Sequence, residues 1–287
     1  MPYPFDNPLV FVPLVALLGL FVGSFLNVVI YRLPVMMEYD WQDEIAESRG
    51  EPLAETERIN LVRPRSRCPH CGHMISALEN IPVISYLFLR GRCRHCHAPI
   101  SIRYPLVELL TALLSGYAAW RFGSNPGTIG ALLFIWMMIT LALIDFDTQL
   151  LPDNLTLPLL WMGLIFNRFT DNILLDDAVI GAVAGYLSLW TVYWLFKLVT
   201  GKEGMGYGDF KLFAAIGAWL GWQMLPLTIL LASVVGALVG IGLILSGRQK
   251  RSVPISFGPF LAAAGLIALF HGETINTLLP IFSAQVP

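Results

Sequence analysis

The chain has 287 residues, of which 56% are hydrophobic and 13% are charged, and its formal net charge at pH 7 is −2. A soluble domain carries about 25% charged residues, so this composition is typical of a membrane protein. Without a strongly basic surface, no nucleic-acid partner is expected.

The first apolar run covers residues 9–31. Asp6 precedes it, no basic segment leads into it and no small-residue cleavage site follows, so we expect a retained helix rather than a signal peptide. Judged against the ~20 residues that cross a bilayer, seven further runs predict membrane helices. They are residues 104–121, 127–147, 154–168, 178–199, 208–222, 225–246 and 255–271. The predicted fold class is an all-α polytopic membrane protein with about eight transmembrane helices.

The distribution of lysine and arginine predicts the orientation of these helices, because both residues are concentrated in cytosolic loops. Ten of the 18 lie within residues 32–103, and six more flank the loops near residues 197–211 and 248–251. Only Arg121 and Arg168 lie on the other side. The long loop is therefore predicted to be cytosolic and both termini periplasmic.

The apolar runs and the long loop divide the chain into four predicted regions. Residues 1–32 are expected to form the first transmembrane helix and residues 33–103 a cytosolic loop domain. Residues 104–271 are expected to form a seven-helix membrane domain, and residues 272–287 a periplasmic tail.

Polar residues follow a small-residue pattern in the first helix. Gly19 and Gly23 have the spacing that is typical of close helix packing. Asn27 and Arg32 follow on the same apolar helix and need polar partners near the membrane boundary. The segment 38–57 then contains eight acids, for which a solvated helical face is the ordinary explanation. These acids are Glu38, Asp40, Asp43, Glu44, Glu47, Glu51, Glu55 and Glu57.

All four cysteines of the chain lie in the long loop, in two C-x2-C pairs separated by 21 residues: Cys68, Cys71, Cys93 and Cys96. Two such pairs suit tetrahedral zinc, and four thiolates leave no open position for water. The predicted metal site is therefore structural. Disulfides are the poorer alternative in a reducing cytosol, and the four nearby histidines (His70, His73, His95 and His97) are alternative ligands or supporting residues.

Three acidic residues lie at membrane depth, where ionisable groups are costly and usually functional. Glu108 lies about one turn inside the second predicted helix, where pairing with a cation such as Arg103 is the simpler explanation. Asp145 ends the third helix, and Asp209 begins the sixth within a glycine-rich segment. Counting crossings places both aspartates on the cytosolic side. Two carboxylates in contact share one proton, which suits acid–base chemistry. In the alternative interpretation, Asp209 is only the N-cap of its helix and Asp145 is an ordinary charge at the membrane interface.

Three stretches carry a resemblance to a known family: Gly206-Tyr-Gly-Asp-Phe-Lys211, Ile144-Asp-Phe-Asp-Thr-Gln-Leu-Leu-Pro-Asp153 and Gly23-Ser-Phe-Leu-Asn-Val-Val-Ile-Tyr-Arg-Leu-Pro34. With the cysteine quartet and Arg103-Tyr-Pro-Leu-Val-Glu108, they resemble the type IV prepilin peptidases, membrane aspartyl proteases of the GxGD type. The resemblance runs in the same order from about residue 9 to residue 270.

The resemblance implies two activities. Asp209 and Asp145 correspond to the catalytic aspartates, with Asp147 as the alternative to Asp145. The family cleaves the basic leader of type IV prepilins and type II secretion pseudopilins after a glycine, on the cytosolic side of the inner membrane. It then methylates the new N-terminus from S-adenosylmethionine, for which Gly23, Asn27 and Arg32 are candidate binding residues. A basic leader also gives the acidic segment a second interpretation, which is attraction of the substrate.

A different class of protein also uses paired intramembrane carboxylates. In transporters such pairs carry protons or cations, often between inverted repeats with interrupted helices. The glycines beside Asp209 have no counterpart near Asp145, and no internal symmetry is evident. The transporter is therefore the second hypothesis.

Overall fold

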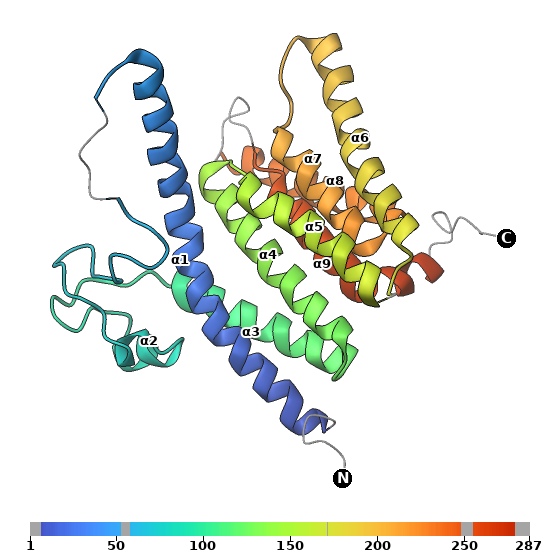
Figure 1. Ribbon diagram of the computed structural model, residues 1–287. Coiled ribbons are helices and arrows are strands. Elements are labelled where there is room, and N and C mark those ends of the chain that lie inside the picture. Colours follow the sequence, from blue (N-terminus) through green and yellow to red (C-terminus); the bar gives the residue numbers. More distant parts are fainter. Residues whose placement is uncertain (1–6, 53–57, 171, 248–254, 279–287) are drawn as a thin grey trace. The chain divides into compact units, whose positions relative to one another are not determined.

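The computed structural model describes residues 7–52, 58–170, 172–247 and 255–278 (Figure 1). In these residues the chain is helical, with two isolated antiparallel bridges and no β-strand. Each of the eight apolar runs predicted from the sequence forms a helix, which confirms the all-α fold class. The chain forms two compact units, Met1–Ser124 and Asn125–Pro287.

Two long helices that pack together form the frame of the first unit: α1 (Pro8–Arg49) and α3 (Arg103–Phe122). Glycines on α1 allow the close approach. A Cβ atom added to Gly19 would lie 2.7 Å from the Ser115 Oγ, and one added to Gly23 would lie 2.8 Å from the Glu108 Cα. The packing role expected for the small-residue pattern is confirmed.

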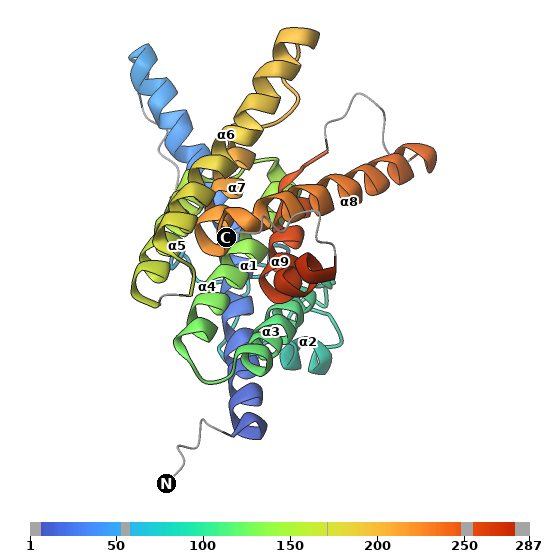
Figure 2. The same ribbon diagram turned by 90° about the vertical axis from the view of Figure 1, so that its right-hand side faces the viewer.

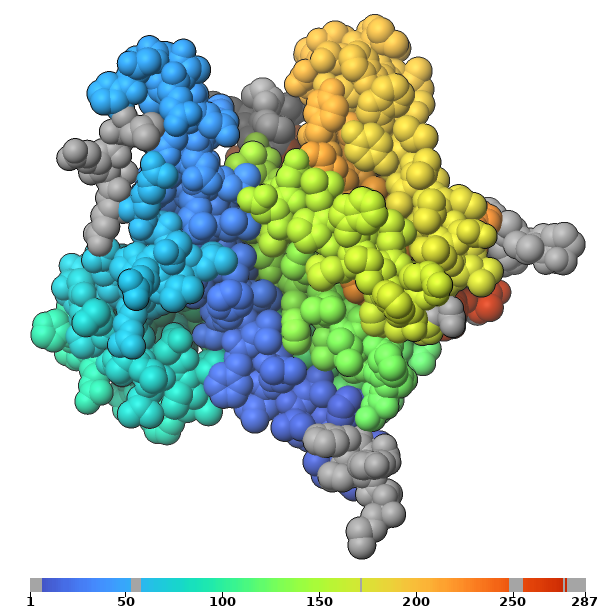
Figure 3. Space-filling view, viewed as in Figure 1, coloured from blue at the N-terminus to red at the C-terminus, as the bar shows by residue number. Residues whose placement is uncertain are grey.

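The helix α1 continues well beyond the predicted span, which was expected to end at residue 31. Pro34, a residue that often ends helices, lies inside it, and the helix ends at Gly50 with a φ of 66°. At 1.5 Å per residue, α1 is about 63 Å long, roughly twice the thickness of a hydrocarbon core. The first part of the predicted loop is thus helical, and its end reaches beyond the cysteine-containing loop (light blue, Figure 3). Glu55 and Glu57 lie outside the described residues.

The remainder of the first unit is mostly turns. It contains a short 3-10 helix, η2 (Leu78–Asn80), and a short α-helix, α2 (Ile84–Phe88). Both lie in the loop that leads from the end of α1 back to α3 (Figure 1).

The second unit is a bundle around α7 (Tyr207–Leu220) (Figures 1 and 2). The helices α5 (Asp153–Thr170), α6 (Leu175–Thr200) and α9 (Gly258–Leu278) pack against α7. The other elements are α4 (Pro126–Thr148), η3 (Trp222–Met224) and α8 (Leu225–Leu245). From Asp209 to Trp219, every residue of α7 except Lys211 is buried.

Among the residues that the structure describes, five helices are long and apolar enough to cross a membrane: α1, α4, α6, the segment from η3 through α8, and α9. The central helix α7 has 14 residues, which gives a length of about 21 Å and leaves it short of a full span. Because α7 is surrounded by other helices, its ends do not have to meet the bilayer surface by themselves. The chain is a multi-pass membrane protein.

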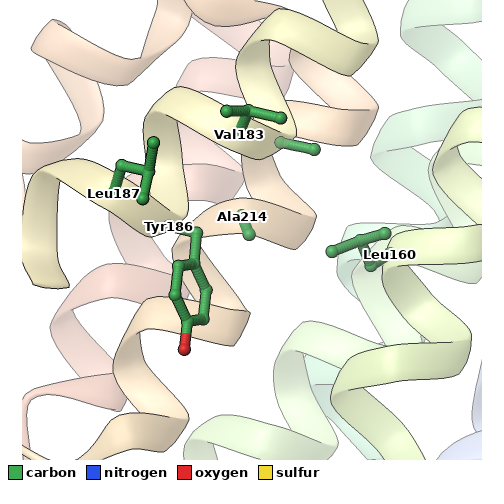
Figure 4. A pocket seen from close by; sticks show the side chains of 6 residues that line it. Leu160, Val183, Tyr186, Leu187 and Ala214 are labelled. Atoms are coloured by element: carbon green, nitrogen blue, oxygen red, sulfur yellow. The ribbon is translucent and has the colours of Figure 1, made fainter.

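A shallow apolar hollow of about 330 Å³ lies between α5, α6 and α7 (Figure 4). It is lined by Leu160, Ala182, Val183, Tyr186, Leu187 and Ala214. None of these side chains is a carboxylate, thiol or imidazole, so the hollow is separate from the groups that could do acid–base chemistry.

Candidate active site and metal centre

Asp145 lies in the last turn of α4 and is 5% exposed. Two groups just before and at the start of α9 hold it. The backbone N–H of Gly258 donates to the Asp145 Oδ2 at 2.9 Å, and the Ser256 hydroxyl donates to the Asp145 carbonyl oxygen at 2.6 Å. The carboxylate is thus buried, and its Oδ2 is bound by the backbone at the start of α9.

Asp209 lies in the first turn of α7 and is 7% exposed. The N-cap of α7 is Gly206, so the alternative in which Asp209 is merely the N-cap is wrong. The Asp209 Oδ1 is buried and has no hydrogen-bond partner within the described residues. A buried carboxylate oxygen without a partner is costly, and such an oxygen is suited to receive a proton, a water molecule or a peptide.

The two aspartates lie near enough for the charge of Asp145 to act on Asp209. The structure thus brings together, from α4 and α7, the two residues that the sequence singled out. Asp147, the alternative partner, is exposed. Burial therefore favours Asp145 over Asp147 as the partner of Asp209.

One glycine beside Asp209 is required by packing. A Cβ atom added to Gly208 would lie 2.6 Å from the Leu151 Cβ in the α4–α5 connection. Gly206 has extended backbone, with φ of −80°, and an added Cβ would find its nearest neighbour, the Asp209 Oδ2, at 3.8 Å. The glycines of this segment therefore do different things, and close approach rather than unusual backbone geometry explains Gly208.

Three residues near the aspartates escaped the sequence analysis. Lys211 forms an ion pair with Asp153, the first residue of α5, across 58 residues of sequence. Ser256 and Gly258 carried no signal beyond a small residue at the start of a helix, because their partner lies more than 100 residues away.

The four cysteines of the long loop form two similar turns. In each, the backbone N–H of the first cysteine bonds to a carbonyl five residues later, at 2.9 Å for Cys68 and 2.8 Å for Cys93. In each, the residue after the second cysteine has a positive φ, 72° at Gly72 and 57° at His97. The sequence repeat C-x2-C is therefore also a structural repeat.

The thiol groups of these turns converge. All four Sγ atoms lie within 4.8 Å of one another, with 3.7 Å between Cys68 and Cys96 and 4.0 Å between Cys71 and Cys93. Tetrahedral zinc with Zn–S bonds of about 2.3 Å places its sulfur atoms about 3.8 Å apart, whereas a disulfide needs about 2.05 Å. Hydrogen bonds from backbone N–H groups, first that of Cys71 and then that of His70, lower the pKa of Cys68 to about 7. At Cys71 the His73 backbone acts in the same direction, but burial and the neighbouring thiols raise its pKa to about 12. The match to zinc therefore rests on the distances between the sulfur atoms.

The nearby histidines are placed for other roles. His97 supplies the left-handed backbone position of the second turn. His73 stacks on His95 with ring centroids 5.5 Å apart, and its Nε2 lies 3.5 Å from a carboxylate oxygen of Glu79. The group of residues that could hold a metal consists of the four cysteines.

The candidate methyl-transfer residues each have a partner within the first unit. Asn27 donates to the carbonyl oxygen of Tyr104 at 3.1 Å. Arg32 donates to the carbonyl oxygens of Asn60 and Pro64, both at 2.7 Å.

Glu108 contributes to the same region. Its Oε2 accepts a hydrogen bond from the backbone N–H of Val83 at 2.7 Å, and its carboxyl also bonds the Ser24 side chain. Gly23 packs against the backbone of Glu108. The polar residues of α1 and α3 thus hold the loop between these helices against them.

Comparisons with known proteins support the division into two units. Residues 17–122 match the Bacterial Peptidase A24 N-terminal domain, and residues 132–241 match the Type IV leader peptidase family. The boundary between the two matches falls at the boundary between the two compact units. No solved structure shows significant similarity to the chain.

Relatives similar to the chain along most of its length bear the name prepilin leader peptidase/N-methyltransferase. The protein from Aeromonas hydrophila is 59% identical over 271 residues, covering 94% of this chain and 93% of the relative. The protein from Pseudomonas aeruginosa is 58% identical over 277 residues, covering 96% of each. One from Burkholderia pseudomallei is 52% identical, covering 91% and 86%. The chain therefore belongs to the type IV leader peptidase family.

Proposed function

We propose that this protein is an aspartyl endopeptidase of the bacterial inner membrane that cleaves the basic leader of type IV prepilins and pseudopilins after a glycine and methylates the new N-terminus. The observation that carries the proposal is that Asp145 and Asp209 lie near enough for the charge of one to act on the other. Both are buried, come from different helices and interact electrostatically. The names of the relatives agree with both activities.

Two such carboxylates can hydrolyse a peptide bond. Two nearby carboxylates do not easily ionise together, so a pair that comes into contact on a bound peptide would share one proton. The ionised carboxylate takes a proton from water as the water attacks the scissile carbonyl, and the protonated one donates a hydrogen bond to the carbonyl oxygen. The proton then passes to the departing amine, which becomes the N-terminus of the mature pilin.

The charge distribution supports a cytosolic position for this site. Asp145 ends α4 and Asp209 begins α7, and α5 and α6 lie between them along the chain. Crossings by both of these helices would return the chain to the same side, although α5 is not among the five helices that are long and apolar enough to cross by themselves. That side carries most of the lysine and arginine residues, as cytosolic surfaces do.

Methyl transfer belongs in this proposal to the first unit. S-adenosylmethionine supplies the methyl group when bound, and Gly23, Asn27 and Arg32 remain the candidate residues for its site. Their contacts support a role in building the site, because they hold α1, α3 and the cytosolic loop together. Photo-crosslinking of the methyl donor to wild type, Asn27→Ala and Arg32→Ala tests this role. Undiminished crosslinking in both variants would exclude it.

The four cysteines are proposed to bind one structural zinc ion. The support is their convergence at distances that match a tetrahedral S4 set. Four sulfur ligands fill the coordination sphere, so the ion has no position for an activated water. The ion would instead crosslink a loop with little regular secondary structure.

A cleavage assay on a purified prepilin, with the enzyme in detergent, tests the protease. Asp145→Asn and Asp209→Asn preserve shape and remove the titrating group, so cleavage should fall by about 10²- to 10⁴-fold. Asp147→Asn is the matched control and should retain activity. Full activity in Asp209→Asn would end the protease proposal, while survival of Asp145→Asn with loss in Asp147→Asn would change only the assignment of the partner. Methylation of a pre-cleaved pilin should survive in the protease-dead variants.

A further inference from the structure

The start of α9 and the residues just before it contact Asp145. Gly258 is the first residue of α9, and its N–H is one of the helix donors that have no partner inside the helix. This N–H donates to the Asp145 Oδ2 at 2.9 Å. Two residues earlier, Ser256 donates to the main-chain oxygen of the same aspartate at 2.6 Å. Side chain and backbone of Asp145 are thus both bound by one short segment.

The fit between Gly258 and Asp145 leaves no room for a side chain. A Cβ atom added to Gly258 would lie 2.5 Å from the Asp145 Oδ2 and 3.0 Å from its Cγ. Gly258 does not have a positive φ, so its backbone conformation does not demand glycine. The glycine is therefore needed for the approach of the carboxylate.

Asp209 has a different environment, although it too lies at the start of a helix. Its Oδ1 is buried without a hydrogen-bond partner in the described part of the chain. Backbone N–H donors stabilise the ionised form of a carboxylate, while burial and a nearby like charge favour the protonated form. At Asp209 the backbone of Gly206 also favours the ionised form, but its effect is smaller than those of burial and of the Asp145 charge. The two carboxylates are therefore not equivalent.

Other charged groups near Asp145 do not change this contrast. On α7, Lys211 is paired with Asp153 of α5. Arg168 on α5, and His271 and Glu273 on α9, lie near the opposite ends of their helices, about 20 Å along the axis. Asp147 on α4 is exposed. Asp209 is left as the charge that faces Asp145.

We infer that Ser256 and Gly258 are positioning residues that hold Asp145 as the ionised member of the pair. Asp145 then activates the water, and Asp209 is the protonated member that donates to the scissile carbonyl. This inference rests on the proposed protease function and assigns separate roles within it.

Kinetics of Gly258→Ala and Ser256→Ala in the full-length protein test the inference. Displacing a catalytic group by about 1 Å can cost about 100-fold, so Gly258→Ala should lower kcat by about that factor with KM within about twofold. The acidic limb of its pH–rate profile should move to higher pH, because the ionised carboxylate loses a donor. Ser256→Ala should lower kcat a few-fold, and Ser256→Thr, which keeps the hydroxyl, should restore it.

Gly265→Ala is the matched control on the same helix. Gly265 is buried, and its added Cβ would meet the end of the flexible Ile216 side chain at 3.1 Å, away from Asp145. It should retain both kcat and the pH profile. Thermal unfolding and methylation of a pre-cleaved pilin report folding of each variant.

The outcomes distinguish failure of the positioning role from failure of the proposed protease function. If Asp145→Asn abolishes cleavage while Gly258→Ala keeps the wild-type kcat and acidic limb, the positioning role is refuted and the protease proposal stands. If Asp145→Asn cleaves normally, the protease proposal itself fails. If Gly258→Ala is misfolded, Ser256→Ala provides the test. The inference would be overturned if Ser256→Ala had the same kcat and the same pH profile as the wild-type protein and as Ser256→Thr.

Discussion

The Lys211 ammonium donates to both carboxylate oxygens of Asp153, at 2.6 and 2.7 Å. The pair joins the first residue of α5 to the second turn of α7, two residues after Asp209. The side chains are 26% and 54% exposed, and ion pairs this exposed contribute at most about 1 kcal/mol to stability. The main effect of the Lys211–Asp153 pair is therefore to fix the position of α7 relative to α5.

Breaking this pair should impair cleavage more than stability. Asp153→Ala or Lys211→Ala should lower the cleavage rate several-fold, while the free energy of unfolding changes by about 1 kcal/mol or less. The charge-swapped double variant, Asp153→Lys with Lys211→Asp, should recover much of the rate because the attraction is restored. Cleavage rates and thermal unfolding check this. Equal loss in the swapped and single variants would show that Lys211 acts in some way other than through Asp153.

The two glycines that precede Asp209 should respond differently to alanine. In Gly208→Ala the new Cβ lies 2.6 Å from the Leu151 Cβ, so the α4–α5 connection or α7 has to move. Cleavage should fall by about 100-fold, the cost of displacing a catalytic group by about 1 Å. In Gly206→Ala the nearest atom to the new Cβ, the Asp209 Oδ2, lies at an ordinary contact distance of 3.8 Å. Alanine at an N-cap costs about 1 kcal/mol relative to glycine, so this variant should retain most of the activity.

Relief at Leu151 provides the internal control for this prediction. Leu151→Gly removes the Cβ atom that Gly208→Ala would meet, so the double variant should cleave faster than Gly208→Ala alone. If Gly206→Ala proves as damaging as Gly208→Ala, packing against Leu151 does not explain the motif.

Local sequence patterns were sufficient to predict most of the fold and most of the candidate site. Apolar runs predicted every long helix, and the spacing of the cysteines predicted their convergence. Chain crossings placed Asp145 and Asp209 on one side, and the structure brings their charges within reach. In each case the information is periodic or lies within a few residues of sequence.

The features that the sequence did not predict depend mostly on contacts between residues far apart in the chain. The hydrogen bond from Gly258 to Asp145 and the Lys211–Asp153 pair join residues far apart in sequence. The length of α1 was underestimated because polar composition was taken to end the helix, whereas a solvated helix can continue beyond the membrane. Hydropathy measures the environment of a helix and does not define its ends.

Removing the metal should loosen the loop that contains the cysteines. The wild-type protein should contain one zinc ion per chain and Cys68→Ser should lose it, because three thiolates hold the ion less well than four. Metal analysis with limited proteolysis of the loop checks this, and His70→Ala, which removes an exposed neighbour, should keep the metal. Chelation that stops cleavage while the loop stays protease-resistant would contradict a structural role.

Glu108 should stabilise a strained turn. Val83 has a φ of 59° and a ψ of −48°, a conformation costly for a β-branched residue, and its N–H donates to the Glu108 carboxylate. Glu108→Ala leaves that N–H without its acceptor and should destabilise the first unit by about 1–3 kcal/mol. Glu108→Gln keeps an acceptor oxygen and should lose less. Val83→Gly relieves the strained backbone, so combining it with Glu108→Ala should recover part of the stability. Denaturant unfolding in detergent measures all four proteins, and a Glu108→Ala variant as stable as wild type would show that the turn holds its conformation without Glu108.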